Sequence, residues 1–261
     1  MKEAIFDTGK VQINYAEGPN SGPAFVLLHG GSARWQYVEN ILPELTSYWH
    51  IFAPDLRGHG KSGRVAWGYA IRDYAEDIQA FLQEISRPAI LFGHSLGGMI
   101  ALMVAGQSPD LVRAVIVGDS PLDKTTHQMI LKQREEELRQ WQSLAGGSHP
   151  VEEIAAVLKN DHLAARLYLQ DPDMLGVLLD DSERAHLGYE MDTLLPTIQC
   201  PVLLLQADPD CGGAMSDTEA ARAVTLLRQP SHIKFHGLSH LLYAENKEVF
   251  LKSIGPFLSQ I

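Results

Sequence analysis

The chain has 261 residues, of which 45% are hydrophobic, and it carries a formal net charge of −11. This length suffices for one sizeable hydrophobic core and leaves room for an inserted subdomain. A surface so rich in negative charge repels nucleic-acid phosphates and anionic lipid headgroups, so neither nucleic acid nor a membrane is an expected partner.

The N-terminal part of the chain predicts a hairpin followed by a buried strand. Strand candidates at 4–6 and 11–15 flank a Thr-Gly-Lys turn, which is typical of an antiparallel hairpin. The continuous apolar run at 24–28 favours a strand that is buried on both faces, as in a parallel sheet. Two glycines follow closely, and glycine lets the backbone approach a ligand. The Gly31 amide is therefore a candidate donor to an oxyanion, unless this segment is only a strand-to-helix turn.

A polar, glycine-rich segment at 54–62 follows the next predicted strand. Three interpretations compete for it. Asp55, His59 and Ser62 could form a catalytic set, or the glycines could hold a phosphate group. The spacing of a phosphate-binding loop is absent. We therefore favour a structural loop in which Asp55 pairs with Arg57.

The strongest pattern lies at 89–102, where an apolar strand runs into Gly-His-Ser-Leu-Gly and a small-residue helix follows. A strand that reverses sharply into a helix strains its corner residue. Glycines two positions before and after that corner remove the collisions. Ser95, at the corner, is a candidate nucleophile, and the Leu96 amide at the helix start is a second candidate oxyanion donor. The alternative is a tight turn with an incidental serine.

The hydrophobic pattern of the chain changes after the predicted strand at 112–117. From residue 123 to 195 there is no strand-like apolar run, and helical stretches are separated by glycine and proline. We therefore expect an α/β core formed by residues 1–122 and 196–261. Residues 123–195 are expected to form a helical cap inserted between two strands of the core.

Strands that alternate with helices predict a mostly parallel central sheet with helices on both faces. The loops at the carboxyl ends of such strands gather at one edge, where ligands bind. The loops that carry Gly31, Ser95, Asp119, Asp210 and His240 all belong to that edge.

A serine hydroxyl needs a base within hydrogen-bond reach and a group that orients the base. His240 is the best candidate base, because it follows the last predicted strand in a Gly-Leu-Ser-His turn. His94 is adjacent to Ser95, but neighbours on a sharp turn point apart. His29 is better suited to bracing the oxyanion loop. The histidines of 123–195 lack the spacing of metal ligands, so we expect no metal and no cofactor.

The acid that orients the base has three candidates. Asp210 follows the predicted strand at 202–206 and is the first candidate. Asp119 follows the preceding strand and is the alternative, because it could reach the same histidine. Asp208 is nearer to its strand but precedes a proline, which restricts its backbone.

Together these motifs closely resemble the α/β-hydrolase fold superfamily. The motifs occur in the order found in that family, and the match covers the chain outside the expected cap. The matching segments are 29–31, 55–62, 93–98, the strand before Asp210, and 237–240.

This resemblance implies an α/β-hydrolase fold with Ser95 as nucleophile, His240 as base, and the amides of Gly31 and Leu96 as the oxyanion hole. It places the acid after the strand that ends at Gln206, with a known variant after the preceding strand. The loop after Gln206 departs from the usual family pattern, so more than one acid remains open. Serine at the elbow distinguishes the chain from haloalkane dehalogenases and epoxide hydrolases, which use aspartate there.

We therefore expect a cofactor-free serine hydrolase that cleaves a small carboxylic ester, thioester or lactone through an acyl-enzyme. The expected partner is a small-molecule substrate with an apolar part. Two alternatives are a hydrolase of carbon–carbon bonds in ring-fission products and a ligand-binding receptor with a slow hydrolase site. Neither the natural substrate nor the oligomeric state follows from the sequence. Candidates to line the pocket, most of them equally suited to the core of the cap, are Trp141, Leu167, Tyr168, Met174, Leu178 and Leu179.

The two cysteines, Cys200 and Cys211, do not form a disulfide framework and fit a reducing compartment. The first residues lack the apolar stretch of a secretory signal. No apolar run approaches the ~20 residues that are needed to span a bilayer. These features favour a cytoplasmic protein.

Overall fold

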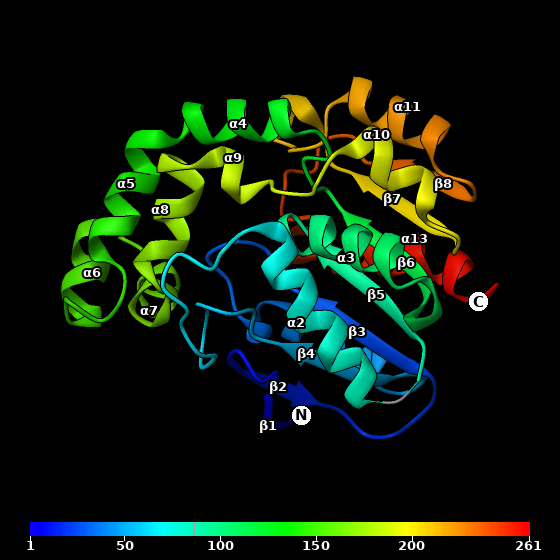
Figure 1. Cartoon of the computed structure of the whole chain (residues 1–261), viewed down its shortest axis with the longest axis horizontal. Coiled ribbons are helices and arrows are strands. Elements are labelled where there is room, and N and C mark those ends of the chain that lie inside the picture. The colour runs from blue at the N-terminus through cyan, green and yellow to red at the C-terminus, as the bar shows by residue number, and fades with distance from the viewer. Residues whose placement is uncertain (86) are drawn as a thin grey trace.

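A central sheet organises the molecule in the computed structural model, which describes residues 1–85 and 87–261 (Figure 1). In this part of the chain the sheet has eight strands in the order β1-β2-β4-β3-β5-β6-β7-β8. The strands are β1 (Lys2–Asp7), β2 (Gln12–Glu17), β3 (Ala24–Leu28), β4 (His50–Pro54), β5 (Ala89–His94), β6 (Val112–Gly118), β7 (Val202–Gln206) and β8 (Pro230–Lys234).

The sheet is mostly parallel, as the sequence predicts. β1 and β2 pair as the expected antiparallel hairpin, and β2 pairs antiparallel with β4. From β4 to β8 all neighbouring strands are parallel. The residues of β3, β4 and β5 are buried throughout, which explains why apolar side chains dominate these strands.

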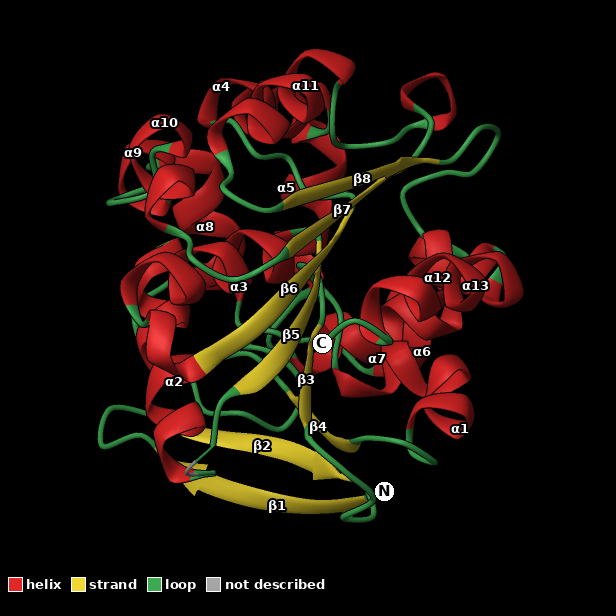
Figure 2. Ribbon diagram, turned by 90° about the vertical axis from the view of Figure 1, so that its right-hand side faces the viewer, coloured by secondary structure: helices red, strands yellow, loops and turns green. Residues whose placement is uncertain are grey.

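Helices cover both faces of the sheet, as Figure 2 shows with the sheet seen nearly edge-on. The α-helices are α1 (Leu42–Leu45), α2 (Ile71–Glu84), α3 (Leu96–Gln107), α4 (Lys124–Gln133), α5 (Glu135–Leu144), α6 (Val151–Leu158), α7 (Asp161–Leu169), α8 (Pro172–Asp180), α9 (Ser182–Ala185), α10 (Met191–Leu194), α11 (Asp217–Leu226), α12 (Leu242–Glu245) and α13 (Lys247–Leu258). Two 3₁₀ helices that concern the site are η1 (Trp35–Ile41) and η4 (Pro209–Cys211).

Alternate residues of each central strand enter different apolar clusters because side chains alternate across a sheet. Val26 and Leu28 of β3 join one cluster, to which α2 and α3 contribute. Phe25 and Leu27 join the other, to which η1, α12 and α13 contribute. The predicted α/β class, with a sheet between two helical layers, is therefore confirmed.

The helical segment, residues 123–195, lies between β6 and β7. In this described stretch helices α4 to α10 follow one another without a strand, and Figure 1 shows α4 to α9 extending beyond one end of the sheet. Leu167 belongs to a small apolar cluster in this segment, and Met174 belongs to the main core. These two candidates for a pocket lining are thus packed in the interior. None of the helices in the described residues is both long and apolar enough to cross a membrane.

Candidate active site

Strand register brings the candidate site residues to one edge of the sheet. Leu28 of β3 lies opposite Gly93 of β5, and His94 lies opposite Gly118 of β6. Gly118 in turn lies opposite Leu205 of β7. The residues that follow these strands therefore begin at the same level, which is where the sequence predicts the site.

Ser95 occupies the sharp corner between β5 and α3. Its φ of 54° and ψ of −119° belong to a region that residues other than glycine rarely adopt. A Cβ atom on Gly93 would lie 2.1 Å from the carbonyl oxygen of Gly97, and one on Gly97 would lie 2.4 Å from that of Leu28. The structure thus confirms that both glycines are required by close packing at this corner.

The Ser95 side chain is half-buried, and among the described residues its Oγ has no hydrogen-bond partner. The Ser95 amide donates to the carbonyl of Gly118 at 3.0 Å, which fixes the corner against β6. The hydroxyl therefore lies in a rigid backbone setting and remains available to a bound molecule.

Two backbone amides near Ser95 have no acceptor in the described part of the chain. They are those of Gly31 and Leu96, the two candidate oxyanion donors. The loop that carries Gly31 lies directly against the serine, because a Cβ atom on Gly30 would be 3.2 Å from the Cβ of Ser95. Two free N–H groups beside a hydroxyl can stabilise negative charge on a substrate oxygen.

Two buried histidines hold this loop as uncharged hydrogen-bonding groups. His29 Nε2 accepts from the Leu56 amide at 3.0 Å, so its proton is on Nδ1, which donates to the carbonyl of Gly30 at 2.7 Å. His59 Nε2 accepts from the Ser32 amide at 3.2 Å. Burial lowers the pKa of His29 to about 4 and that of His59 to about 3. Both rings therefore stay neutral near pH 7 and brace the loop.

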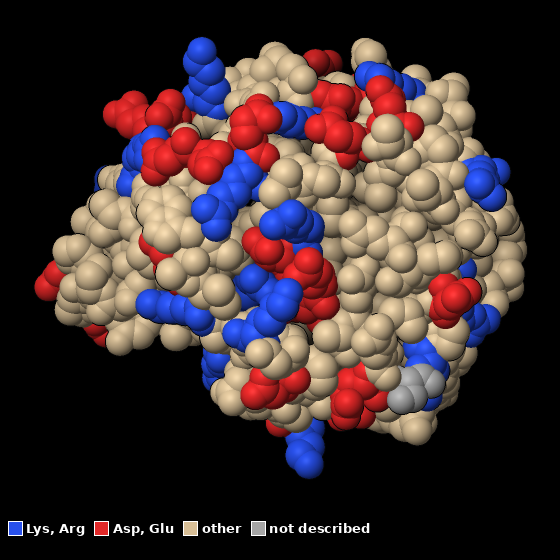
Figure 3. All heavy atoms as spheres, viewed as in Figure 1, with Lys and Arg blue, Asp and Glu red and all other residues tan. Residues whose placement is uncertain are grey.

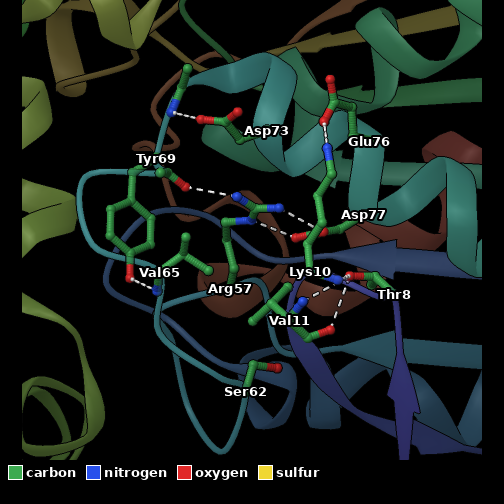
Figure 4. A network of polar contacts seen from close by, with 12 residues as sticks. Thr8, Lys10, Val11, Arg57, Ser62, Val65, Tyr69, Asp73, Glu76 and Asp77 are labelled. Atoms are coloured by element: carbon green, nitrogen blue, oxygen red, sulfur yellow. Dashed lines mark hydrogen bonds and ion pairs between the residues drawn. The ribbon is translucent and has the colours of Figure 1, made fainter.

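The segment at 54–62 is a structural loop, but the predicted pair within it is wrong. Arg57 forms two hydrogen bonds with Asp77 of α2, at 2.6 and 2.7 Å, rather than with Asp55 (Figure 4). Asp55 instead accepts from the amides of Trp35 and Lys61 at 2.8 and 3.0 Å. Its carboxylate is used by backbone donors, whereas α2 brings a second buried carboxylate to the guanidinium.

His240 is paired with the carboxylate that follows β6. Asp119 is fully buried, and its Oδ2 lies 2.7 Å from His240 Nδ1. The same carboxylate accepts from the amides of Ala214, Ala207 and Met215 at 2.7, 2.9 and 3.3 Å. Burial opposes ionisation, but the hydrogen bonds from His240 and the amides together lower the pKa of Asp119. Asp119 therefore stays charged and keeps the proton of His240 on Nδ1.

The first candidate for the acid, Asp210, forms no hydrogen bond or ion pair with His240. It is exposed in η4, where its amide donates to Asp208 Oδ1 at 3.1 Å. Asp208 also accepts from the Gly237 amide at 2.8 Å, so it stabilises a turn. Of the candidate acids, the alternative Asp119 therefore contacts His240, and the first candidate Asp210 does not. Asp119 has a positive φ of 44°, and the turn at this residue directs its carboxylate to His240.

His94 contacts the backbone of His240, a contact that the sequence does not predict. Its Nε2 lies 2.8 Å from the carbonyl oxygen of His240, and since a carbonyl only accepts, Nε2 is the donor. Burial, and then the nearby charge of His240, lower the pKa of His94 to about 3. The place of a histidine beside the serine is visible in the sequence, but its distant acceptor is not. His94 holds the backbone of His240 in place.

Within residues 1–85 and 87–261, no group of three or more His, Cys, Asp or Glu side chains is arranged to hold a metal ion. The chemistry available from the residues themselves is that of a serine hydroxyl, a histidine with its carboxylate, and two free amides. This set can transfer an acyl group to serine and then to water.

Comparisons with known proteins identify the family of the chain. The model of the alpha/beta hydrolase family matches residues 25–252. The 2-(acetamidomethylene)succinate hydrolase of Mesorhizobium japonicum is 32% identical over 186 residues, which cover 70% of this chain and 60% of that protein. The matched part of the chain thus spans less than two thirds of that relative's length.

Solved structures extend the similarity over nearly the whole chain. The crystal structure of E-2-(acetamidomethylene)succinate hydrolase has a TM-score of 0.77 at 24% identity, with 99% of both chains covered. The structure of an N-acyl homoserine lactone degrading enzyme also has a TM-score of 0.77, at 19% identity, over 97% of this chain and 100% of that one. At these identities the similarity shows a shared fold.

Proposed function

The chain belongs to the alpha/beta hydrolase family, and on that premise we propose that it is a serine hydrolase that cleaves a small carboxylic ester, thioester or lactone. Ser95 is the nucleophile, His240 the general base and acid, and Asp119 the acid of the triad. The amides of Gly31 and Leu96 form the oxyanion hole.

The contact of 2.7 Å between His240 Nδ1 and Asp119 Oδ2 is the observation that carries this proposal. With the proton held on Nδ1, Nε2 has a lone pair that can accept the proton of Ser95. The side chain of His240 is 28% exposed, so Nε2 has access to a substrate. Ser95 Oγ makes no hydrogen bond to His240 here, and such contacts often tighten only when substrate binds.

In the proposed reaction, Ser95 Oγ attacks the carbonyl carbon while His240 Nε2 takes the hydroxyl proton. The oxygen of the tetrahedral intermediate accepts hydrogen bonds from the two free amides. Loss of one such donor typically raises the barrier by about 3–4 kcal/mol. The intermediate then releases the leaving group, which receives the proton from His240. Water, activated by the same histidine, hydrolyses the acyl-enzyme and frees Ser95.

We further propose that residues 1–122 and 196–261 form the catalytic core and that residues 123–195 form a cap over it. Contacts at the base of the helical segment support this division. Tyr69 donates to Asp171 Oδ2 at 2.6 Å, and the Asp171 amide donates to a carbonyl of the 54–62 loop at 2.8 Å. The segment is thus anchored beside the loop that braces the oxyanion hole.

The names of relatives support hydrolysis and leave the bond open. One relative is called a hydrolase of 2-(acetamidomethylene)succinate, and one structural neighbour is called a lactone-degrading enzyme. A hydrolase of carbon–carbon bonds would use the same nucleophile, and the experiment below separates it from an esterase.

The test is hydrolysis of 4-nitrophenyl esters from acetate to decanoate by the wild type and by Ser95→Ala, together with labelling of Ser95 by a fluorophosphonate. Activity that is lost in Ser95→Ala supports the proposal, and the preferred chain length measures the acyl site. Labelling without turnover of any ester would favour carbon–carbon bond cleavage. Ester hydrolysis that survives in Ser95→Ala would refute the assignment of the nucleophile.

A further inference from the structure

A small pocket between η1 and α7 is lined by two arginines, a glutamine, a tyrosine and a histidine, and by no carboxylate. Its volume is about 150 Å³, and its lining residues are Arg34, Gln36, Tyr37, His162 and Arg166. His162 and Arg166 are four positions apart on α7, so they lie on the same face of that helix. The pocket therefore receives its positive charge from two separate parts of the chain.

Neither Arg34 nor Arg166 has a carboxylate partner among the described residues. This is notable in a chain with 32 acidic and 21 basic residues. Figure 3 shows acidic and basic side chains interspersed over the face of the molecule in view. Two guanidinium groups that line one pocket with no carboxylate in its lining create a local site of positive potential, which attracts an anion.

The Arg166 guanidinium is held in a defined orientation. Its Cζ lies 5.1 Å from the centre of the Tyr37 ring, and its Nε donates to the carbonyl of His162 at 3.3 Å. A guanidinium stacked on an aromatic ring keeps its remaining N–H groups at the periphery, where a planar anion can accept two of them.

The pocket adjoins the catalytic edge of the sheet. The Tyr37 ring lies 6.0 Å from the ring of Tyr243, which lies 5.4 Å from the ring of His94 beside the serine. Arg34 follows Gly31 by three positions, which limits their Cα atoms to a separation of about 11 Å. The charge of Arg166 also contributes, after burial, to the lowered pKa of His29 in the oxyanion loop.

We propose that this pocket binds a carboxylate group of the substrate through Arg34 and Arg166, so that the preferred substrates are anionic. The scissile carbonyl is held at Ser95, and the carboxylate is a few bonds away along the same molecule. A pocket of this volume suits a small acidic group better than a long acyl chain. This inference rests on the proposed function, since it names the substrate class of that site.

Matched pairs of esters test the proposal. The half 4-nitrophenyl esters of succinate, glutarate and adipate are compared with 4-nitrophenyl butyrate, pentanoate and hexanoate, in which a methyl group replaces the carboxylate. Uncatalysed hydrolysis is subtracted for each. We expect the wild type to have a higher kcat/KM for at least one half ester than for its neutral counterpart. Arg34→Met and Arg166→Met should each lower that preference by about tenfold or more.

Two further variants act as controls. Arg166→Lys keeps the charge but loses the planar fork, so it should retain part of the preference. Arg184→Met removes an exposed arginine of the helical segment that lies outside the pocket, and the preference should not change. The inference is overturned if the wild type prefers the neutral esters, or if the two arginine variants lower kcat/KM for both members of a pair by the same factor.

A binding measurement separates this inference from the proposed function. Calorimetry with Ser95→Ala and succinate, glutarate or adipate reports on the pocket without turnover. Binding that weakens at least tenfold when Arg34→Met or Arg166→Met is added supports the carboxylate site, even if no ester is hydrolysed. Absence of dicarboxylate binding, in an enzyme that hydrolyses neutral esters through Ser95, would reject the site and leave the hydrolase proposal in place.

Discussion

Replacement of Asp119 by asparagine tests which carboxylate acts through His240. Asp119 Oδ2 accepts from His240 Nδ1 and from the Ala214 amide, each at 2.7 Å, and Oδ1 accepts from two further backbone amides. Asparagine has one oxygen and one nitrogen in these two positions. Whichever way it is oriented, its NH₂ group faces groups that are themselves donors.

The two orientations have different costs. With the nitrogen toward the two backbone amides, both lose a buried acceptor at about 1–3 kcal/mol each. With the nitrogen toward His240, only the Ala214 amide loses its acceptor, and the ring can respond by moving its proton from Nδ1 to Nε2. The second orientation is therefore the cheaper one. In it the histidine can no longer accept the proton of Ser95, so kcat should fall by about 10³- to 10⁴-fold, or about 4 to 5.5 kcal/mol in the barrier.

The assay is kcat for 4-nitrophenyl butyrate, or for the best substrate found, with thermal unfolding measured on the same preparations. Asp210→Asn is the matched control, because this exposed residue has no contact with His240, and its kcat should stay within about threefold of the wild type. A folded Asp119→Asn enzyme with kcat within tenfold of the wild type would refute the reasoning. A large loss in Asp210→Asn instead would return the role to that residue.

Three further predictions concern the surroundings of the site. His94→Phe removes the donor to the backbone carbonyl of His240 and should lower kcat about three- to tenfold in steady-state assays. His94→Gln should lose less, and a kcat of His94→Phe equal to that of the wild type would show that His94 does not position His240. The pKa values of His29 and His59, lowered by burial to about 4 and about 3, lie below the ~6.5 of an unfolded histidine. Between the folded and unfolded pKa values the unfolded chain binds more protons, so the free energy of unfolding should fall by about 2 kcal/mol per histidine from pH 7 to pH 5. Urea titrations at several pH values measure this, and a free energy of unfolding that does not change with pH would show that the rings are not held neutral. Gly97→Ala places a methyl group 2.4 Å from a β3 carbonyl and should lower the melting temperature, whereas Gly255→Ala, which meets nothing within 4 Å, should not.

Much of the site could be predicted because it depends on local geometry. The corner at Ser95 needs small neighbours at fixed positions, so a short pattern identifies it. The two candidate oxyanion amides follow from the same argument, since they belong to the ends of neighbouring strands. The place of His240 can be predicted from the order of the strands alone, because it follows the last short strand.

The acid could not be chosen in the same way. Asp119 and Asp210 both follow buried strands, and the choice depends on which loop turns toward His240 in three dimensions. The backbone amides of Ala207 and Ala214, which bind Asp119, lie almost ninety positions or more further along the chain. The partner of Arg57 could not be chosen for the same reason. Asp55 is nearer in the sequence but accepts from backbone amides, and Arg57 pairs with Asp77 of α2 instead.

The cationic pocket was likewise invisible in the sequence. Arg34 follows a loop whose pattern is set by its glycines, and Arg166 lies on a helix with no motif around it. Only the packing of the helical segment beside η1 brings the two guanidinium groups to one place.

The helical segment leaves β6 and returns at β7, and these two strands are adjacent and in register, with Val115 opposite Val202. Because the two strands are parallel, the segment leaves at the carboxyl end of β6 and returns at the amino end of β7, so its two connections lie toward opposite edges of the sheet. Asp119 stands just upstream of the helical segment, and its carboxylate accepts from the amides of Ala207 and Ala214, which follow β7. The hydrogen bonds to the Asp119 carboxylate therefore come from the ends of the core strands, and a change within the helical segment would leave them in place.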